Sequence, residues 1–290
     1  MPSSWLELSV RTHPSALDSA ANFLIEKGSP GVVLGKARVK AYFPRENGRA
    51  APILGETRRF LRRLARFFPG GEASELRWRI LPERDWNRSW RSFFSPQKIG
   101  RRFLVAPPWD VPGRPGRRLP IVIEPGQAFG TGTHATTRGC LELIEQVDRL
   151  LGKKRYIALD VGTGSGILAI ALAKLGAAGV VALDNDPLAL KAAGENLRRN
   201  GVAGKVRLSR AGVARLKKKF SLVVANLTAG TILEIAEPLC RRVSAGGFLI
   251  LSGILEPQAE EVLRHPAMTR FRLLRRRREG EWATFLLRRA

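Results

Sequence analysis

The chain has 290 residues, 44% of them hydrophobic, which is enough to bury a core without disulfides and long enough for two domains. Its 50 lysines and arginines outnumber 25 acidic residues, so the formal net charge is +25 at pH 7. Such a charge fits either contact with RNA or a solvated arginine-rich surface, and no RNA-binding motif decides between them. No apolar run could span a bilayer and no signal peptide is visible, so a cytoplasmic protein without a membrane partner is expected.

The two cysteines, Cys140 and Cys240, lie 100 positions apart in predicted helices. They lack metal-ligand spacing, which indicates a reducing compartment and no metal site. Both are expected to be small residues of the core.

Residues 1–82 predict a small α+β domain. The predicted strands are 4–11, 31–35, 38–44 and 75–81, and the predicted helices are 14–27 and 55–68. The order β-α-β-β-α-β is typical of the ferredoxin-like fold.

Residues 83–118 are predicted to be a linker, because "PPWDVPGRPG" cannot form regular structure. Four aromatic side chains fall at helical spacing at its start and are expected to pack between domains. They are Trp86, Trp90, Phe93 and Phe94.

Residues 119–290 alternate apolar strands with helices, which predicts a mostly parallel sheet covered on both faces. The last two segments, "FRLLRRRRE" and "EWATFLLRR", predict a hairpin that adds antiparallel pairing. The predicted fold is therefore α/β, with a seven-stranded Rossmann-like domain that follows the ferredoxin-like domain.

A glycine loop follows the strand "RYIALDVG". Gly162, Gly164 and Gly166 let the backbone turn sharply and approach a ligand closely. The spacing is G-x-G-x-G, and Ile167 stands where a dinucleotide fingerprint needs glycine. No G-K-[ST] follows, so a pyrophosphate ligand is disfavoured.

Asp184 ends the next strand, 22 positions after Gly162. An acidic side chain there can accept hydrogen bonds from both hydroxyls of a ribose. A glycine loop with a ribose-binding acid, but without phosphate-binding features, favours a nucleoside ligand such as S-adenosyl-L-methionine.

A third unusual stretch, "EPGQAFGTGTHATT" at 124–137, has neither helical nor strand periodicity. Together with "DVGTGSGILAIALAKLGA", "DNDPLALKAAGENLRRNGV", "VVANLTAG" and "LSGIL", it resembles the PrmA family, the methyltransferases of large-subunit ribosomal protein eleven. The resemblance extends to "DWNRSWRSFFSPQKIG" and "VAPPWD" and covers nearly the whole chain. It implies a class I methyltransferase domain at 119–290, with a ribosomal protein as partner and substrate.

The resemblance also implies site residues. The family's cofactor contacts fall on Thr137, Gly162, Asp184 and Asn226, in addition to Gly164 of the glycine loop. Phe129 and the backbone of Gly130 to Gly132 would close over the methionine end of S-adenosylmethionine. The alternative for this loop is a plain helix cap by Thr136 or Thr137. His134 either orients the loop or substrate, or simply packs.

The sequence departs from the family pattern in three respects. Glu124 stands where aspartate is common, and Thr163 where cysteine is frequent. The strong basicity is the larger departure, because a ribosomal protein is itself basic and long-range charge would oppose the encounter. Acidic patches in residues 1–82, a contribution from ribosomal RNA or a different target would each resolve this conflict.

Asn226 is the candidate catalytic residue, because its amide oxygen at a strand end could accept a hydrogen bond from the amine that is methylated. Leu227, Thr228 and Ala229 follow, so no aromatic ring is available to stack a planar base. This favours a flexible aliphatic amine. A helix-capping role for Asn226 is compatible with the same position.

The leading hypothesis is a monomeric protein N-methyltransferase that acts on lysine ε-amines, and on an α-amine as a second target, with residues 1–82 recognising the substrate. The alternative is a ribosomal RNA methyltransferase, which the charge favours and the missing ring opposes. A ribosome-binding protein with a vestigial site is a third hypothesis, which the intact glycine loop and Asp184 oppose.

Overall fold

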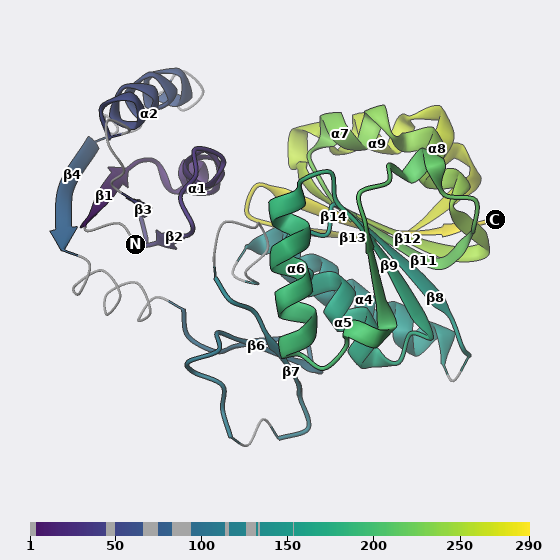
Figure 1. Ribbon diagram of the computed structural model, residues 1–290. Helices are drawn as coiled ribbons and strands as arrows, with labels where there is room; N and C mark the ends of the chain where they lie inside the picture. The colour runs from purple at the N-terminus through teal and green to yellow at the C-terminus, as the bar shows by residue number, and fades with distance from the viewer. Residues whose placement is uncertain are drawn as a thin grey trace. The chain divides into compact units, whose positions relative to one another are not determined.

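The computed structural model describes residues 4–44, 50–65, 75–82, 94–113, 116–125, 132, 134–152 and 154–290. It divides into two compact units (Figure 1), residues 1–95 with 125–127 and residues 96–124 with 128–290. In the described part, no helix has both the length and the apolar character needed to cross a membrane.

The first unit is a four-stranded antiparallel sheet in the order β2-β3-β1-β4 with two helices. Its elements are β1 (Ser4–Arg11), α1 (Leu17–Glu26), β2 (Val32–Leu34), β3 (Arg38–Pro44), α2 (Ala50–Ala65) and β4 (Glu75–Pro82). Every second residue of β1 faces the helices, so Leu6, Leu8 and Val10 pack against Leu24 and Leu61 in one core. This is the predicted ferredoxin-like arrangement.

One helix of this unit begins earlier than the sequence predicts. α2 starts at Ala50 rather than Gly55, because Pro52 lies in the first helical turn, where a proline costs no hydrogen bond. The predicted helix 14–27 is divided into a 3₁₀ turn, Pro14–Ala16, and α1.

Part of the predicted linker is a sheet. β5 (Gln97–Ile99) and β6 (Phe103–Ala106) form an antiparallel hairpin, and β6 pairs in parallel with β7 (Leu119–Val122). Strands form here instead of an irregular linker because Phe103 and Ile121 are fully buried in the core of the second unit. Trp86, Trp90 and Phe93 lie outside the described residues, and Phe94 is buried.

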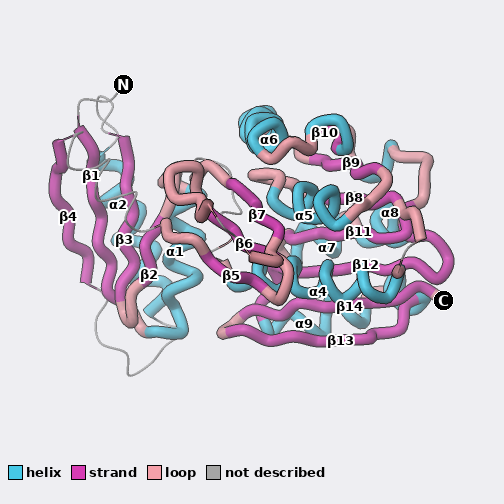
Figure 2. Tube along the Cα trace, turned by 90° about the horizontal axis from the view of Figure 1, so that it is seen from below, coloured by secondary structure: helices cyan, strands magenta, loops and turns pink. Residues whose placement is uncertain are grey.

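The second unit is built on a seven-stranded sheet in the order β10-β9-β8-β11-β12-β14-β13, with the strands side by side in Figure 2. The strands are β8 (Ile157–Val161), β9 (Gly179–Leu183), β10 (Val206–Ser209), β11 (Phe220–Asn226), β12 (Val243–Leu255), β13 (Phe271–Glu279) and β14 (Trp282–Arg289). The first five are parallel, and β14 is antiparallel to both of its neighbours. The predicted Rossmann-like sheet and C-terminal hairpin are confirmed.

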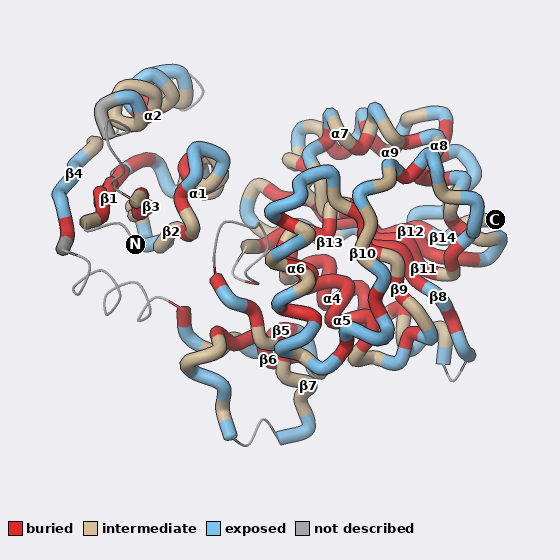
Figure 3. The backbone as a smooth tube through the Cα atoms, viewed as in Figure 1, coloured by how far each residue is buried: buried red, intermediate tan, exposed pale blue. Residues whose placement is uncertain are grey.

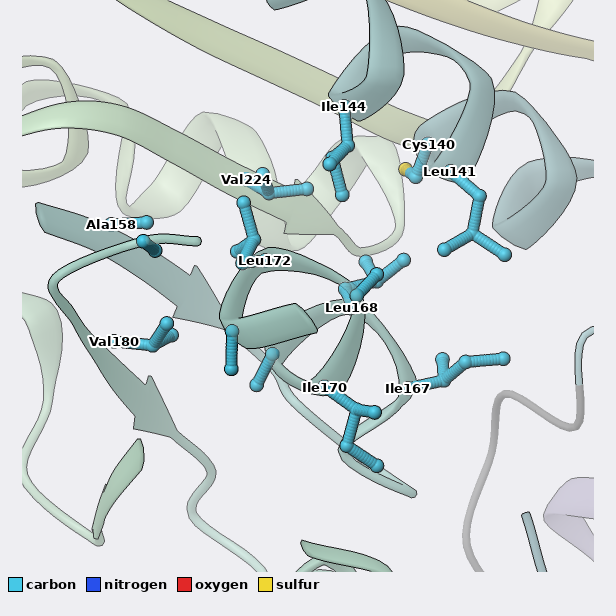
Figure 4. Packing of buried hydrophobic residues seen from close by; sticks show 14 of the residues in the cluster. Cys140, Leu141, Ile144, Ala158, Ile167, Leu168, Ile170, Leu172, Val180 and Val224 are labelled. Atoms are coloured by element: carbon cyan, nitrogen blue, oxygen red, sulfur yellow. The ribbon is translucent and has the colours of Figure 1, made fainter. Parts of the chain in front are cut away.

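Helices cover both faces of this sheet, and the parallel strands are largely buried between them (Figure 3). The helices are α4 (Ala135–Leu151), α5 (Ile167–Leu175), α6 (Pro187–Arg199), α7 (Ala229–Glu234), α8 (Ala236–Arg241) and α9 (Ala259–Arg264). α4 and α5 pack on one face, where Ile144 and Leu172 lie beside Val224 (Figure 4), while α7, α8 and α9 pack on the other. The predicted helix 229–242 is interrupted at Ile235.

Both cysteines are free residues of these two cores, as the sequence predicts. Burial raises the pKa of the Cys140 thiol far above its ordinary value and that of Cys240 to about 12. Both thiols are therefore protonated and unreactive near neutral pH.

Two glycines of β12 have a left-handed backbone, but only one has close neighbours. A Cβ at Gly253 would lie 2.4 Å from the carbonyl oxygen of Leu227, whereas one at Gly246 would meet nothing within 4 Å. Gly253→Ala is expected to lower the free energy of unfolding by about 1–3 kcal/mol more than Gly246→Ala, because both pay the left-handed cost and only the first adds a clash. Urea unfolding of the two variants measures the difference, and equal losses would contradict the close approach.

Candidate functional site

The chemistry-bearing residues lie at the carboxyl-terminal edge of the seven-stranded sheet. After β8 the chain crosses to β9 on one side, and β11 pairs with β8 on the other. The order of the strands therefore reverses between β8 and β11, and open α/β sheets bind ligands in the crevice beyond such a reversal. The loops after β8, β9 and β11 meet at this point.

The glycine loop after β8 requires glycine for both backbone conformation and space. Gly162, Gly164 and Gly166 have φ values of +75°, +52° and +83°. A Cβ at Gly162 would lie 2.4 Å from Leu227 Cδ2, and one at Gly166 would lie 3.2 Å from Ala193 Cβ. The loop is therefore held between the chain after β11 and helix α6.

Asp184 follows β9 and fixes this loop through hydrogen bonds. Its carboxylate accepts one from the backbone N–H of Gly164 at 2.9 Å and another from the N–H of Asp186 at 3.1 Å. Each oxygen retains acceptor capacity. Asp184 is half-buried, so the remaining capacity lies beside the glycine loop and in reach of a ligand.

Asp160 lies beneath the same loop and is fully buried. Its Oδ2 accepts a hydrogen bond from the Thr163 hydroxyl at 2.7 Å. Burial raises the pKa of Asp160 to about 7, against the lowering effect of Thr163 and the backbone N–H of Ala169, and the nearby Asp184 charge raises it further. Thr163 replaces the cysteine frequent in the resembling family and supplies a stronger donor to this carboxyl group.

Two asparagines at the end of α6 hold neighbouring segments: Asn196 joins the glycine loop to the residues after β7, and Asn200, the C-cap, bonds the end of β7. Asn196 is buried; its Nδ2 donates to the carbonyl oxygen of Ser165 at 2.9 Å, and its Oδ1 accepts from the N–H of Glu124 at 3.1 Å. Asn200 bonds both the N–H and the carbonyl oxygen of Val122. Neither asparagine was predicted as a site residue from the sequence, although their i, i+4 spacing within "ENLRRN" places them on one helix face.

Asn226 ends β11 directly beside the glycine loop. Ala225 pairs with Val161, so Asn226 is the next residue beyond the β8–β11 ladder. Its Oδ1 is buried and has no hydrogen-bond partner among the described residues. The side chain of Thr228, and not that of Asn226, caps α7, so the proposed capping role of Asn226 is wrong.

A hydrogen bond from β12 attaches the first turn of α4 to the same edge of the sheet. Ser252 pairs with Asn226 across the β11–β12 ladder, and its hydroxyl donates to the carbonyl oxygen of Thr136 at 3.3 Å. Thr137 is fully buried, and its hydroxyl has no partner within the described residues. The sequence alternative of a threonine cap is wrong, because His134 is the N-cap residue.

His134 packs as well as caps. Its Nδ1 lies 2.7 Å from the Thr136 hydroxyl, and its ring meets Trp282 of β14 edge-on at 5.1 Å between centroids. These contacts fix the side chain of His134 at the start of α4.

The structure thus brings together Thr137, Gly162, Gly164, Asp184 and Asn226, which come from four different segments of the predicted site. Phe129 and Gly130 lie outside the described residues. Gly132 is described, and a Cβ there would lie 2.8 Å from Val105 Cγ1, so the end of this loop rests closely on β6.

Comparison with known proteins agrees with this arrangement. The family model described as "Ribosomal protein L11 methyltransferase (PrmA)" matches residues 4–290. The chain belongs to this family. Relatives named ribosomal protein L11 methyltransferase from Pelotomaculum thermopropionicum and Geobacter sulfurreducens are each 37% identical, and the matches cover 98% and 99% of this chain and of theirs. A solved structure titled ribosomal protein L11 methylase, from Lactobacillus delbrueckii subsp. bulgaricus, is 32% identical, with a TM-score of 0.62 over 68% of this chain and 99% of that one.

S-adenosylmethionine is therefore the cofactor of this PrmA family member, and the residues at the carboxyl edge fit it. Two buried side-chain oxygens without partners in the described part, Thr137 Oγ1 and Asn226 Oδ1, can bond polar groups of the cofactor or of the group that it methylates. The glycine loop leaves room for close backbone approach, and Asp184 retains acceptors for ribose hydroxyls.

The buried Asp160 predicts an unusual pH dependence of stability. Its folded pKa of about 7 lies above the ordinary 3.8, so between these values the folded state holds a proton that the unfolded state has lost. Wild-type stability should therefore fall relative to Asp160→Asn as pH rises from about 4 to about 7, because only the wild type must ionise a buried group. Urea unfolding of both proteins at pH 5 and pH 8 measures this change, and parallel pH profiles would exclude it.

Proposed function

We propose that the chain transfers methyl groups from S-adenosylmethionine to amino groups of ribosomal protein L11, with lysine ε-amines as the main targets and the α-amine as a second. The names of the relatives support the protein substrate. The observation that carries the amine assignment is the buried, unbonded Oδ1 of Asn226 beside the glycine loop, in the part of the chain that the structure describes. A ribosomal protein substrate would place the enzyme in the cytoplasm.

Methyl transfer requires mainly that the protein align the amine with the methyl group of the cofactor. When bound, the cofactor supplies an electrophilic methyl group on a sulfonium. The amine must be neutral, and its lone pair must point at that methyl group. Asn226 Oδ1 accepts a hydrogen bond from the amine N–H and so fixes the direction of the lone pair. A site that excludes water favours the uncharged amine, so no strong base is required.

The residues after Asn226 support an aliphatic amine over a planar base. Leu227 packs closely against Gly162 through its side chain and against Gly253 through its backbone. Thr228 caps α7 and points its hydroxyl toward Thr231. Neither residue offers a ring to stack a flipped base, which disfavours ribosomal RNA as the methyl acceptor.

Asp184 is proposed to bind the ribose of the cofactor. Asp184→Asn should weaken S-adenosylmethionine binding about ten- to hundredfold, because charge-assisted hydrogen bonds contribute about 1.5–3 kcal/mol. Calorimetric titration measures the affinity. Asp186→Asn is the matched control, since it removes the same charge two residues away and asparagine still caps α6. Equal affinities for the two variants would remove Asp184 from the ribose site.

Asn226 is proposed to align the amine. Asn226→Ala should lower turnover at saturating cofactor about a hundredfold with little effect on cofactor affinity, because the hydrogen bond acts chiefly in the transition state. Thr228→Ala is the control, which removes a helix cap at the same loop and should leave turnover nearly unchanged. Steady-state kinetics and calorimetry separate the two effects.

The pH profile provides a second test of Asn226. The wild-type rate should rise with pH until the bound amine is deprotonated, and Asn226→Ala should keep that rise at a lower level because an amide does not titrate. A variant that loses cofactor affinity but keeps its turnover would show instead that Asn226 binds only the cofactor.

The first unit is proposed to recognise the protein substrate, because the cofactor residues all lie beyond it in sequence. The whole proposal is tested by incubating the enzyme with methyl-labelled cofactor, purified L11 and ribosomal RNA, followed by mass spectrometry of both products. Label on lysines of L11 is expected, and a chain without residues 1–82 should bind cofactor yet leave L11 unmethylated. Label on the RNA alone would exclude the proposed function.

A further inference from the structure

The seven-stranded sheet separates charge along its strands. The amino-terminal edge collects the residues that precede β8, β10, β11 and β12 and, because β14 is antiparallel to both neighbours, the end of β14 with the start of β13. Basic clusters that are far apart in the sequence therefore meet at one edge. Its exposed cations are Lys154, Arg155, Lys205, Lys217, Lys218, Lys219, Arg241, Arg270, Arg272 and Arg288.

The acidic residues at the other end of the strands lie among basic ones, and Glu256 and Glu279 pair there with Arg276 and Arg277. Those that end or follow a strand at the carboxyl edge are Asp184, Asp186, Glu256, Glu279 and Glu281. At the amino edge, the acidic residue nearest to Arg241 along the chain is Glu237, which already pairs with it at 2.8 Å. Several cations near the carboxyl edge are thus neutralised by ion pairs, whereas most of the amino-edge cations have no ion-pair partner among the described residues.

Most of the edge cations are available to a partner. In the described part of the chain, no hydrogen bond or ion pair occupies the side chains of Lys154, Arg155, Lys205 or the three lysines Lys217–Lys219. Two neighbouring arginines have a different role, because Arg242 donates to the carbonyl oxygen of Leu216 and Arg289 to that of Val243. They stiffen the loops that carry the free cations.

The dimensions of this surface suit a polyanion. Seven strands about 4.8 Å apart form an edge about 29 Å long, and its cations are spread over strands from β10 to β13. A row of mostly unpaired cations matches the regularly spaced phosphates of a nucleic acid backbone. We propose that the amino-terminal edge of the seven-stranded sheet is an RNA-docking surface, which contacts phosphates while the carboxyl edge remains free for methyl transfer.

The choice of RNA rests on the proposed ribosomal substrate, but the binding itself does not require methylation. It is measured by fluorescence anisotropy with a labelled 20-nucleotide RNA duplex, without cofactor, between 50 and 300 mM salt. The full-length wild type should bind with a dissociation constant of about 1–10 μM near 100 mM salt and a steep salt dependence.

The decisive variant replaces Lys217, Lys218 and Lys219 with glutamine. All three side chains are exposed in the loop before β11, so the fold should be unaffected. RNA affinity should fall about tenfold or more, and the slope of log K against log salt should decrease in magnitude by about 2–3, because up to three phosphate contacts are lost. A second edge triple, Lys154→Gln with Arg155→Gln and Lys205→Gln, should behave in the same way.

The matched control removes three exposed charges elsewhere, by Arg58→Gln, Arg62→Gln and Arg63→Gln on α2. It should bind RNA within about twofold of the wild type. Equal losses in the edge and control variants would overturn the proposal, since net charge alone would then explain the binding. Wild type that fails to bind RNA, or that binds phosphatidylglycerol vesicles instead, would overturn it too. The edge variants should methylate L11 at the wild-type rate. If the wild type itself does not methylate L11, the proposed function is refuted but the RNA-docking proposal is not.

Discussion

The structure of the site depends on the clamp that the Asp184 carboxylate places on the backbone of Gly164 and Asp186. The backbone N–H groups of Gly162 and Thr163 bond the carbonyl oxygen of Leu183, and the carboxylate extends this attachment to the next residues of both loops. Asn196 also holds the glycine loop, because its Nδ2 donates a hydrogen bond to the carbonyl oxygen of Ser165. A glycine loop held on both sides can come close to a ligand without losing its shape, which is the preorganisation that cofactor binding needs.

Close packing around Leu227 determines which residues lie beside the glycine loop. Leu227 lies between Gly162 and Gly253, and a Cβ at either glycine would come within 2.4 Å of it. That close fit fixes the backbone after β11 and leaves the Asn226 amide at the strand end, bounded by the glycine loop on one side and β12 on the other. A side chain that only has to orient an amine gains most from such rigidity, because alignment is most of its contribution to the rate.

The separation of charge along the strands bears on the conflict between a basic enzyme and a basic substrate. The total of +25 suggests repulsion, but repulsion depends on where the charges lie and is screened beyond about 10 Å at 0.1 M salt. The amino edge carries the exposed lysine and arginine clusters, whereas Asp184, Asp186 and Glu256 lie at the catalytic edge. The cations of the amino edge therefore contribute little repulsion to a basic polypeptide that approaches the carboxyl edge.

Local periodicity in the sequence was enough to predict the order of the elements and the two fold classes, and glycine spacing and polar residues at strand ends indicated candidate site residues. Gly162, Asp184 and Asn226 could be named in this way, since each stands directly after a predicted buried strand. The sheet at 97–106 was not predicted, because its strands are short and are held by burial of Phe103 rather than by their own pattern.

Only the tertiary structure decided the contacts between distant segments. Asn196 joins Glu124 to Ser165 across 72 and 31 positions of sequence, a role that periodicity cannot express. The basic edge has the same origin. Parallel strands joined by crossover helices bring all their amino ends to one side, so clusters as far apart as Lys154 and Arg288 become neighbours of a single surface only once the chain is folded.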